Sequence, residues 1–163
     1  MSRKIAYGGM LLGINIILLL LINIIPMNTL FLMGLASLPI SIVIMESGAK
    51  TGLAFYLASV SLGFIVMNSK FQWILYSLTF GVYGLVKYLI EQDRAIVVEY
   101  ILKIVFANII IVVTCFILKP FVYIPVNLFT IALFEVLFIV YDYIYTRFID
   151  YYELKIRKII KDI

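Results

Sequence analysis

Six long runs of apolar residues follow one another along the chain, separated by short polar stretches. A helix needs about 20 apolar residues to cross a bilayer, with a range of roughly 17 to 25. Runs of this length predict membrane-spanning helices. The 3.6-residue period within them is weak, as is typical of helices that are apolar on most sides. The predicted spans are residues 5–25, 30–45, 51–67, 71–90, 96–118 and 121–145.

The second span is the least regular of the six. It is short, and it contains Pro39, which removes a backbone donor and crowds the carbonyl group of Leu35. We therefore expect this helix to be kinked or broken at the proline. The polar segments between spans are short, so consecutive helices are expected to pack as neighbours.

The composition supports the assignment to a membrane. Of the 163 residues, 65% are hydrophobic and 13% are charged, whereas soluble domains are about half apolar and about a quarter charged. A soluble domain of this size exposes too much surface to hide so many apolar side chains. We predict an all-α, polytopic protein of the cell membrane, with a six-helix transmembrane domain at residues 1–148 and a tail at residues 149–163.

The positions of Lys and Arg predict the orientation. If the N-terminus is cytoplasmic, the cytoplasmic loops and ends carry eleven of these residues and the outer loops carry two, Lys70 and Lys119, which accounts for all 13. This asymmetry follows the positive-inside rule and predicts that both termini are cytoplasmic. Because the charges flank apolar runs and form no single basic face, the net charge of +4 does not indicate a nucleic-acid partner.

The predicted tail is basic and amphipathic. Aromatic residues are concentrated between Tyr141 and Tyr152, and beyond them isoleucines alternate with Lys and Arg at roughly helical spacing. Aromatic rings with a polar tip are typical of the lipid–water boundary. A helix of this kind indicates contact with the anionic cytoplasmic leaflet or with a helix of a partner.

Ionisable side chains within the spans are the first candidates for function, because each is costly at the bilayer centre unless it is paired or hydrated. Glu135 lies near the middle of the sixth span. It is expected to face the bundle interior, either in a ligand or ion site or as a structural hydrogen-bonding group. Asp142 is predicted to pair with Lys87 or Lys103 from the cytoplasmic ends of neighbouring helices. Lys87 is also placed to extend to the cytoplasmic surface.

A ligand pocket near the extracellular end is the second hypothesis. Asn23 and Asn127 lie toward the outer ends of their spans, where amides either line a pocket or join helices by hydrogen bonds. Trp73, at the outer end of the fourth span, is either an interfacial anchor or a stacking platform at the mouth of such a pocket. With Glu135, these residues form the predicted ligand-binding set.

Small residues at a spacing of four predict close helix packing in two spans. Gly9 and Gly13 form a GxxxG motif in the first span. The third span repeats the spacing in three pairs: Gly48 and Gly52, Ala54 and Ala58, and Ser59 and Gly63. Such faces pack either within the bundle or against a partner.

The side chains that usually carry catalysis or bind metals are scarce. The chain has no His, and its single Cys115 lies within an apolar run. No glycine-rich phosphate loop is present. Glu135 and Asp142 are about 10 Å apart along a helix axis, too far for direct coupling, and no nucleophile–base pair accompanies them. We therefore predict no enzymatic activity, no metal site and no cofactor.

The first half of the chain carries a resemblance to a known family. Arg3, Lys4 and Ala6 precede the motif of Gly9 and Gly13, and residues 35–39 and 46–52 follow in the next spans. In these segments the chain resembles the substrate-capture subunits (S components) of energy-coupling factor transporters, which have six short helices and cytoplasmic ends. The resemblance covers mainly the first 70 residues.

The resemblance implies a binding subunit that captures a small, vitamin-like molecule for uptake with an ATP-driven partner. Gly9 and Gly13 stand where the family docks on its membrane coupling subunit. The alternative hypothesis is a scaffold without transport activity, similar to the membrane proteins of cell-envelope or cell-shape assembly. A polar cavity enclosed by the outer halves of the spans favours the binding subunit, and a filled bundle favours the scaffold.

Overall fold

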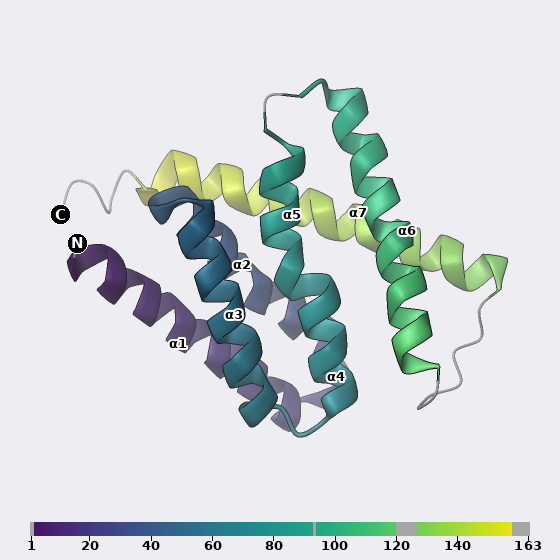
Figure 1. Ribbon diagram of the computed structural model, residues 1–163, viewed down its shortest axis with the longest axis horizontal. Helices are drawn as coiled ribbons and strands as arrows, with labels where there is room; N and C mark the ends of the chain where they lie inside the picture. The colour runs from purple at the N-terminus through teal and green to yellow at the C-terminus, as the bar shows by residue number, and fades with distance from the viewer. Residues whose placement is uncertain (1, 93, 120–126, 158–163) are drawn as a thin grey trace.

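The computed structural model describes residues 2–92, 94–119 and 127–157, and every regular element in these ranges is helical (Figure 1). The elements are α1 (Ser2–Ile24), η1 (Pro26–Asn28), α2 (Thr29–Ser47), α3 (Ala49–Val66), α4 (Lys70–Leu75), η2 (Tyr76–Gly81), α5 (Val82–Ile90), α6 (Ile96–Leu118), α7 (Leu128–Tyr151) and η3 (Tyr152–Ile156).

Six helical segments in the described ranges are long and apolar enough to cross a membrane. This confirms the all-α class and the prediction of six helices long and apolar enough to span a membrane. The observed ends of the first five lie close to the predicted ones, and the predicted start of the sixth at residue 121 lies outside the described residues. The segments are Ile5–Ile24, Pro26–Ser47, Ala49–Val66, Lys70–Ile90, Ile96–Leu118 and Phe129–Lys155.

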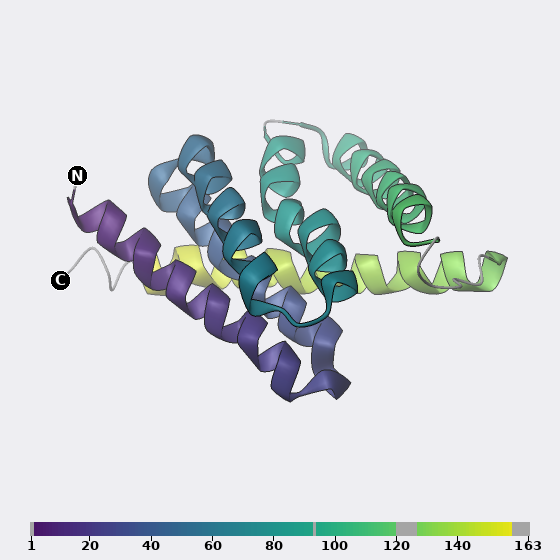
Figure 2. The same ribbon diagram turned by 60° about the horizontal axis from the view of Figure 1, so that its bottom comes forward.

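The helices differ in how tightly they pack. α1, α2 and α3 pack closely on one another, and α5 lies against α2 and α3. α6 lies at the edge of the bundle beside α5, and α7 crosses α2, α5 and α6 steeply in both views (Figures 1 and 2). The start of α1 and the end of α7 meet, because the hydroxyl groups of Tyr7 and Tyr152 are 3.1 Å apart.

α2 is the centre of the core. Its side chains contribute to two apolar clusters, one toward each end of the bundle, and Met33 and Ile40 are fully buried. The first cluster consists of Leu11, Ile40, Ile42, Val43, Ile44, Phe55 and Tyr152. The second consists of Leu19, Ile22, Leu32, Met33, Ala36, Met67 and Tyr76.

The expected break at Pro39 does not occur, because α2 runs through the proline as one helix. Side chains from other helices bond to the carbonyl groups of the preceding turn. The carbonyl of Ala36 accepts a hydrogen bond from the Asn15 amide, and that of Ser37 accepts one from the Tyr145 hydroxyl at 3.2 Å. Prolines are tolerated in membrane helices where neighbouring helices bond to the backbone in this way.

The Asn15 amide also joins α1 to α3 and η2. Its Oδ1 accepts a hydrogen bond from Ser59 at 2.7 Å, and its Nδ2 donates to the Tyr76 hydroxyl at 2.9 Å. All three side chains are fully buried. Asn15 therefore connects helices inside the bundle, as amides commonly do in membranes.

The fourth span contains a π-helical segment, η2, that the sequence did not predict. Gly81 at its end lies against the Tyr56 ring, which is 3.2 Å from where a Cβ atom would stand. Within the segment, the Thr79 hydroxyl donates to the carbonyl of Leu75. π-Helical segments are rare and occur frequently at functional sites.

Gly52, Ser59 and Gly63 of the third span face inward, whereas Gly48, Ala54 and both glycines of the motif in the first span are exposed. Gly52 and Gly63 are buried, and a Cβ atom at Gly52 would collide with Ile44 of α2. Gly9 and Gly13 are exposed, and a Cβ atom at either would have no described atom within 4 Å. We call Gly9 and Gly13 the glycine face.

α7 continues without a break past residue 148 and through η3. Tyr152 is buried, and Arg157 pairs with Glu46 at the end of α2, with 3.0 Å between Nε and Oε1. The described part of the predicted tail therefore packs against the ends of α1 and α2. Residues 158–163 of the tail lie outside the described residues.

Candidate functional site

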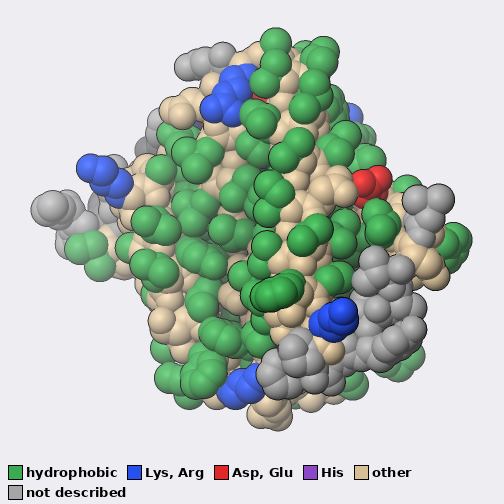
Figure 3. All heavy atoms as spheres, turned by 45° about the vertical axis from the view of Figure 1, so that its right-hand side comes forward, with side chains coloured by type: hydrophobic (Ala, Val, Ile, Leu, Met, Phe, Trp, Pro, Cys, Tyr) green, Lys and Arg blue, Asp and Glu red, His purple; other side chains and the backbone are tan. Residues whose placement is uncertain are grey.

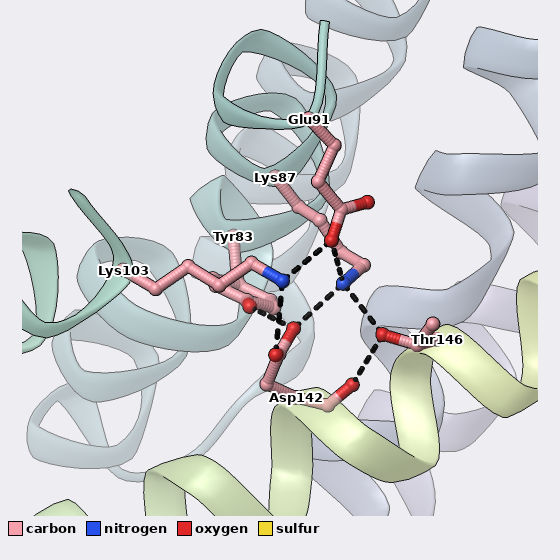
Figure 4. Close-up of polar contacts among 6 residues, drawn as sticks. All are labelled: Tyr83, Lys87, Glu91, Lys103, Asp142 and Thr146. Atoms are coloured by element: carbon pink, nitrogen blue, oxygen red, sulfur yellow. Dashed lines mark hydrogen bonds and ion pairs between the residues drawn. The ribbon is translucent and has the colours of Figure 1, made fainter. Parts of the chain in front are cut away.

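A buried group of charged and polar side chains lies where α5, α6 and α7 meet (Figure 4). Its members come from positions that are far apart in the sequence, and their polar atoms converge on Asp142 and Glu91. We call this group the charge cluster: Tyr83, Lys87, Glu91, Lys103, Asp142 and Thr146.

Each lysine of the charge cluster contacts both carboxylates. Lys87 Nζ lies 2.6 Å from Oδ1 of Asp142 and 2.5 Å from Oε1 of Glu91, and it also donates to Thr146 Oγ1 at 2.7 Å. Lys103 Nζ lies 3.0 Å from Oδ2 of Asp142 and 2.5 Å from the same Glu91 oxygen. Two cations therefore face two anions, and the cluster is electrically balanced.

Burial makes this balance necessary. The Lys87 side chain is 1% exposed and that of Asp142 is 11% exposed. Removing one partner from a buried ion pair is strongly destabilising, because the other charge is left uncompensated in a medium of low polarity. All four charges have partners within the cluster, so the cluster connects three helices.

The predicted pairing of Asp142 with Lys87 or Lys103 is confirmed, since Asp142 contacts both. The predicted extension of Lys87 to the surface is wrong, because its ammonium group bonds inside the bundle. Glu91 was missed. Its spacing of four residues from Lys87 is the available signal, since such pairs meet on a helix.

Tyr83 connects the charge cluster to an apolar region. Its hydroxyl donates to Oδ1 of Asp142 at 2.5 Å, while its ring packs edge-on against Phe138 at 5.3 Å between centroids. The Tyr83 ring lines a cavity of about 140 Å³ between α4–α5 and α6–α7. The other residues that line it are Leu30, Leu75, Thr79, Phe80, Phe106, Ala107, Ile110, Phe134, Leu137, Phe138 and Tyr141.

A second cavity, of about 210 Å³, adjoins the first and shares Leu75 and Phe134 with it. Its other lining residues are Phe71, Ile111, Thr114, Cys115, Leu118, Thr130 and Ile131. We call the two cavities together the apolar groove. It extends from Tyr83 toward the ends of the spans that are predicted to be extracellular.

The apolar groove contains one buried polar atom without a partner. Thr114 is 9% exposed, and its Oγ1 has no hydrogen-bond partner within the described part of the chain. A hydroxyl group left unpaired in an apolar surrounding costs about 1–3 kcal/mol. Each such group in a native structure calls for an explanation, and a bound molecule is one.

A third cavity lies on the other side of the charge cluster, between α2, α5 and α7. It has a volume of about 330 Å³, and it is more polar than the groove because Lys87, Glu91 and Gln92 contribute to its wall. The charge cluster therefore separates the apolar groove from a cavity at the end predicted to be cytoplasmic. The remaining lining residues are Ser41, Ile44, Met45, Gly84, Tyr88 and Ile149.

The four residues of the predicted ligand-binding set do not come together. Asn23 bonds the end of α3: its Nδ2 donates to the Val66 carbonyl at 2.9 Å, and its Oδ1 accepts from the Asn68 backbone at 3.0 Å. Trp73 donates from Nε1 to the carbonyl of Val60 at 2.9 Å. Both side chains thus stabilise the end of α3 and the turn between α3 and α4.

The other two members lie on α7. Asn127 caps the helix by accepting a hydrogen bond from the backbone of Thr130 at 2.8 Å. Glu135 is half-buried and accepts a hydrogen bond from Asn108 of α6 at 3.0 Å. Neither residue lines the apolar groove, and the same is true of Asn23 and Trp73. Sequence reasoning sought polar groups and so passed over an apolar site.

Comparison with known proteins finds no matching family model, no matching curated protein and no matching solved structure. The resemblance to substrate-capture subunits therefore stays a prediction.

Proposed function

We propose that this chain is a multi-pass protein of the cell membrane, with cytoplasmic ends, that binds a small and largely apolar molecule in the apolar groove. Within this proposal it acts as the binding subunit of an uptake system whose partner supplies energy from ATP. The observation that carries the proposal is the unpaired Thr114 hydroxyl in a groove lined by apolar and aromatic side chains.

The size of the groove supports a ligand. An apolar space of about 150 Å³ is large enough to hold a molecule such as benzene. The two cavities of the groove have volumes of about 140 and 210 Å³. Together they offer room for a ring system or a branched chain, with aromatic contacts from Phe80, Phe106 and Phe138.

The lining indicates the chemistry of the ligand. Nearly all of its side chains are apolar, and the Tyr83 hydroxyl is already bonded to Asp142. A ligand charge would have no counterion in the groove among the described residues. The ligand class is therefore a neutral molecule, mostly hydrocarbon, with one hydroxyl or carbonyl group positioned for Thr114.

The proposal is tested by native mass spectrometry of the protein purified in mild detergent. Wild type is expected to retain a bound small molecule. Ala107 is 2% exposed and lines the groove, so Ala107→Phe should fill the space and abolish retention. Ala54→Phe, at an exposed position of α3 that does not line the groove, is the matched control and should retain the molecule. Equal retention in both variants would refute the groove as the site.

The scaffold remains the second candidate, and the exposed glycine face favours it. Small residues let helix backbones approach closely, and no described residue uses this face. Gly9→Leu with Gly13→Leu should abolish co-purification of partner subunits while the bundle stays folded. Ile14→Leu, an exposed position on the same helix, should leave co-purification unchanged. Partner loss combined with an empty groove would favour the scaffold.

A further inference from the structure

A polar pair lies at the surface of the molecule where α6 contacts α7, on the side that faces away from the bundle. Asn108 is near the middle of α6 and is exposed, and Glu135 of α7 is half-buried beside it. Asn108 Nδ2 donates to Glu135 Oε1 at 3.0 Å. We call this outer side, with Asn108 and Glu135, the α6–α7 seam.

Lipid is a poor neighbour for this pair. The surface around the seam is apolar, with exposed Ile104 and Val112 on α6 and Val136 and Ile139 on α7. Figure 3, which brings the α6–α7 side of the molecule forward, shows mostly hydrophobic side chains and few charges on that face. A carboxyl group at this depth of a bilayer is costly unless a polar partner covers it.

Each residue of the pair has hydrogen-bonding capacity left. Asn108 Nδ2 also donates to the carbonyl of Ile104 at 3.0 Å, so both amide hydrogens are used. Its Oδ1, and the second carboxyl oxygen of Glu135, have no hydrogen-bond partner among the described residues. An amide oxygen is an acceptor, and a carboxyl group that holds its proton has one O–H to donate.

We propose that the α6–α7 seam is the interface of a homodimer. In this arrangement the Glu135 carboxyl O–H of each copy donates to Asn108 Oδ1 of the other. A twofold interface is self-complementary, because one surface meets itself. In a dimer whose Glu135 carboxyl groups are protonated, each copy presents one spare donor and one spare acceptor, which is the combination that a second copy satisfies completely. Acyl chains satisfy neither group.

The helix face permits a close approach. Ala132 lies one turn before Glu135 on α7 and is exposed. Small residues at membrane interfaces allow helix backbones to approach closely enough for hydrogen bonds between them. The glycine face on α1 is a separate surface, so the homodimer does not depend on the proposed partner or ligand.

Crosslinking of the full chain in proteoliposomes tests the geometry. The native thiol is first removed by Cys115→Ala. Ala132→Cys and Ile139→Cys, on the seam, should each give a covalent dimer with a short bis-maleimide. Leu57→Cys is the matched control: it is exposed on α3, away from the seam, and should stay monomeric. Equal crosslinking at Leu57 and at the seam positions would overturn the proposal.

Substitutions test the hydrogen bonds. Glu135→Leu and Asn108→Leu each remove both reciprocal bonds, and each should raise the dimer dissociation constant about tenfold or more, measured by energy transfer between labelled copies. Glu135→Gln keeps a donor and an acceptor and should stay within about threefold of wild type. A wild-type protein that is monomeric, or a dimer that tolerates both Leu variants, would overturn the proposal. So would crosslinking of the seam to another protein in native membranes.

Discussion

Lys87 Nζ lies 2.6 Å from Oδ1 of Asp142, and this buried contact joins α5 to α7. Asp142 Oδ2 reaches Lys103 of α6 on its other side, at 3.0 Å. α6 and α7 have fewer contacts with the bundle than the first three helices have with one another. Asp142 thus joins both of the loosely packed helices, α6 and α7, to α5 through buried ion pairs.

The first prediction concerns this carboxylate. Asp142→Asn leaves Lys87 and Lys103 with Glu91 as their one anionic partner, so we expect it to destabilise the protein by about 3–5 kcal/mol. The free energy of unfolding is measured in mild detergent, with the loss of helical circular dichroism as the signal. Asp150→Asn, on an exposed carboxylate of the same helix, should change the stability by less than about 0.5 kcal/mol.

A double substitution separates charge imbalance from lost packing. Asp142→Leu with Lys87→Met removes one charge of each sign and leaves Glu91 paired with Lys103. Replacing a buried ion pair with apolar side chains is often neutral or stabilising. The double variant should therefore lose less stability than the sum of the two single variants, by about 1–3 kcal/mol. Additive losses would show that charge balance is not what stabilises the cluster.

The next prediction concerns Gly84 of α5. A Cβ atom there would lie 2.6 Å from the Tyr145 hydroxyl oxygen and 3.2 Å from Ile40. Gly84→Ala should destabilise the protein by about 1–3 kcal/mol through overpacking, in the same unfolding measurement. Gly8→Ala is the matched control, since a Cβ atom there would meet no described atom within 4 Å, and it should be neutral or stabilising.

Removal of the obstructing atom supplies a second test of the same contact. Tyr145→Phe deletes the hydroxyl group, so Gly84→Ala should cost less in that background than in wild type. An equal cost in both backgrounds would mean that Ile40, and not Tyr145, makes the small residue necessary.

The orientation of the chain is tested by labelling. In the Cys115→Ala background, Lys50→Cys and Lys155→Cys should be protected from a membrane-impermeant thiol reagent in intact cells. Lys70→Cys and Lys119→Cys should react. All four positions are exposed, so access depends on the side of the membrane. Reaction of Lys50→Cys and Lys155→Cys on opposite sides would refute the six-span orientation.

Some of these features could be predicted from the sequence because their physical cause is local. Span length follows from bilayer thickness, so six apolar runs gave six helices. The pairing of Asp142 with lysines follows from charge sign and depth alone. Pro39 shows the limit of local reasoning, because the helix continues through it by bonds to Asn15 and Tyr145, which are distant in the sequence.

The candidate site was less predictable for a similar reason. Apolar spans carry little periodicity, so which faces meet and where they leave space cannot be read from the sequence. The apolar groove is lined by residues of α4, η2 and α5 on one side and of α6 and α7 on the other, which are far apart in the sequence. Thr114 looks like any threonine in an apolar run until its surroundings are known.

Thr114 gives the last prediction, in which two measurements should move in opposite directions. Thr114→Val removes an unpaired hydroxyl group and keeps the shape of the side chain. Without ligand, the variant should be more stable than wild type by about 1 kcal/mol, because a buried polar group no longer lacks a partner. Retention of the bound molecule, measured by native mass spectrometry, should nevertheless fall about tenfold.

Thr79→Val is the control. Thr79 also lines the groove, but its hydroxyl already donates to the carbonyl of Leu75, so ligand retention should change little. A gain of stability with unchanged retention would show that the Thr114 hydroxyl does not contact a ligand.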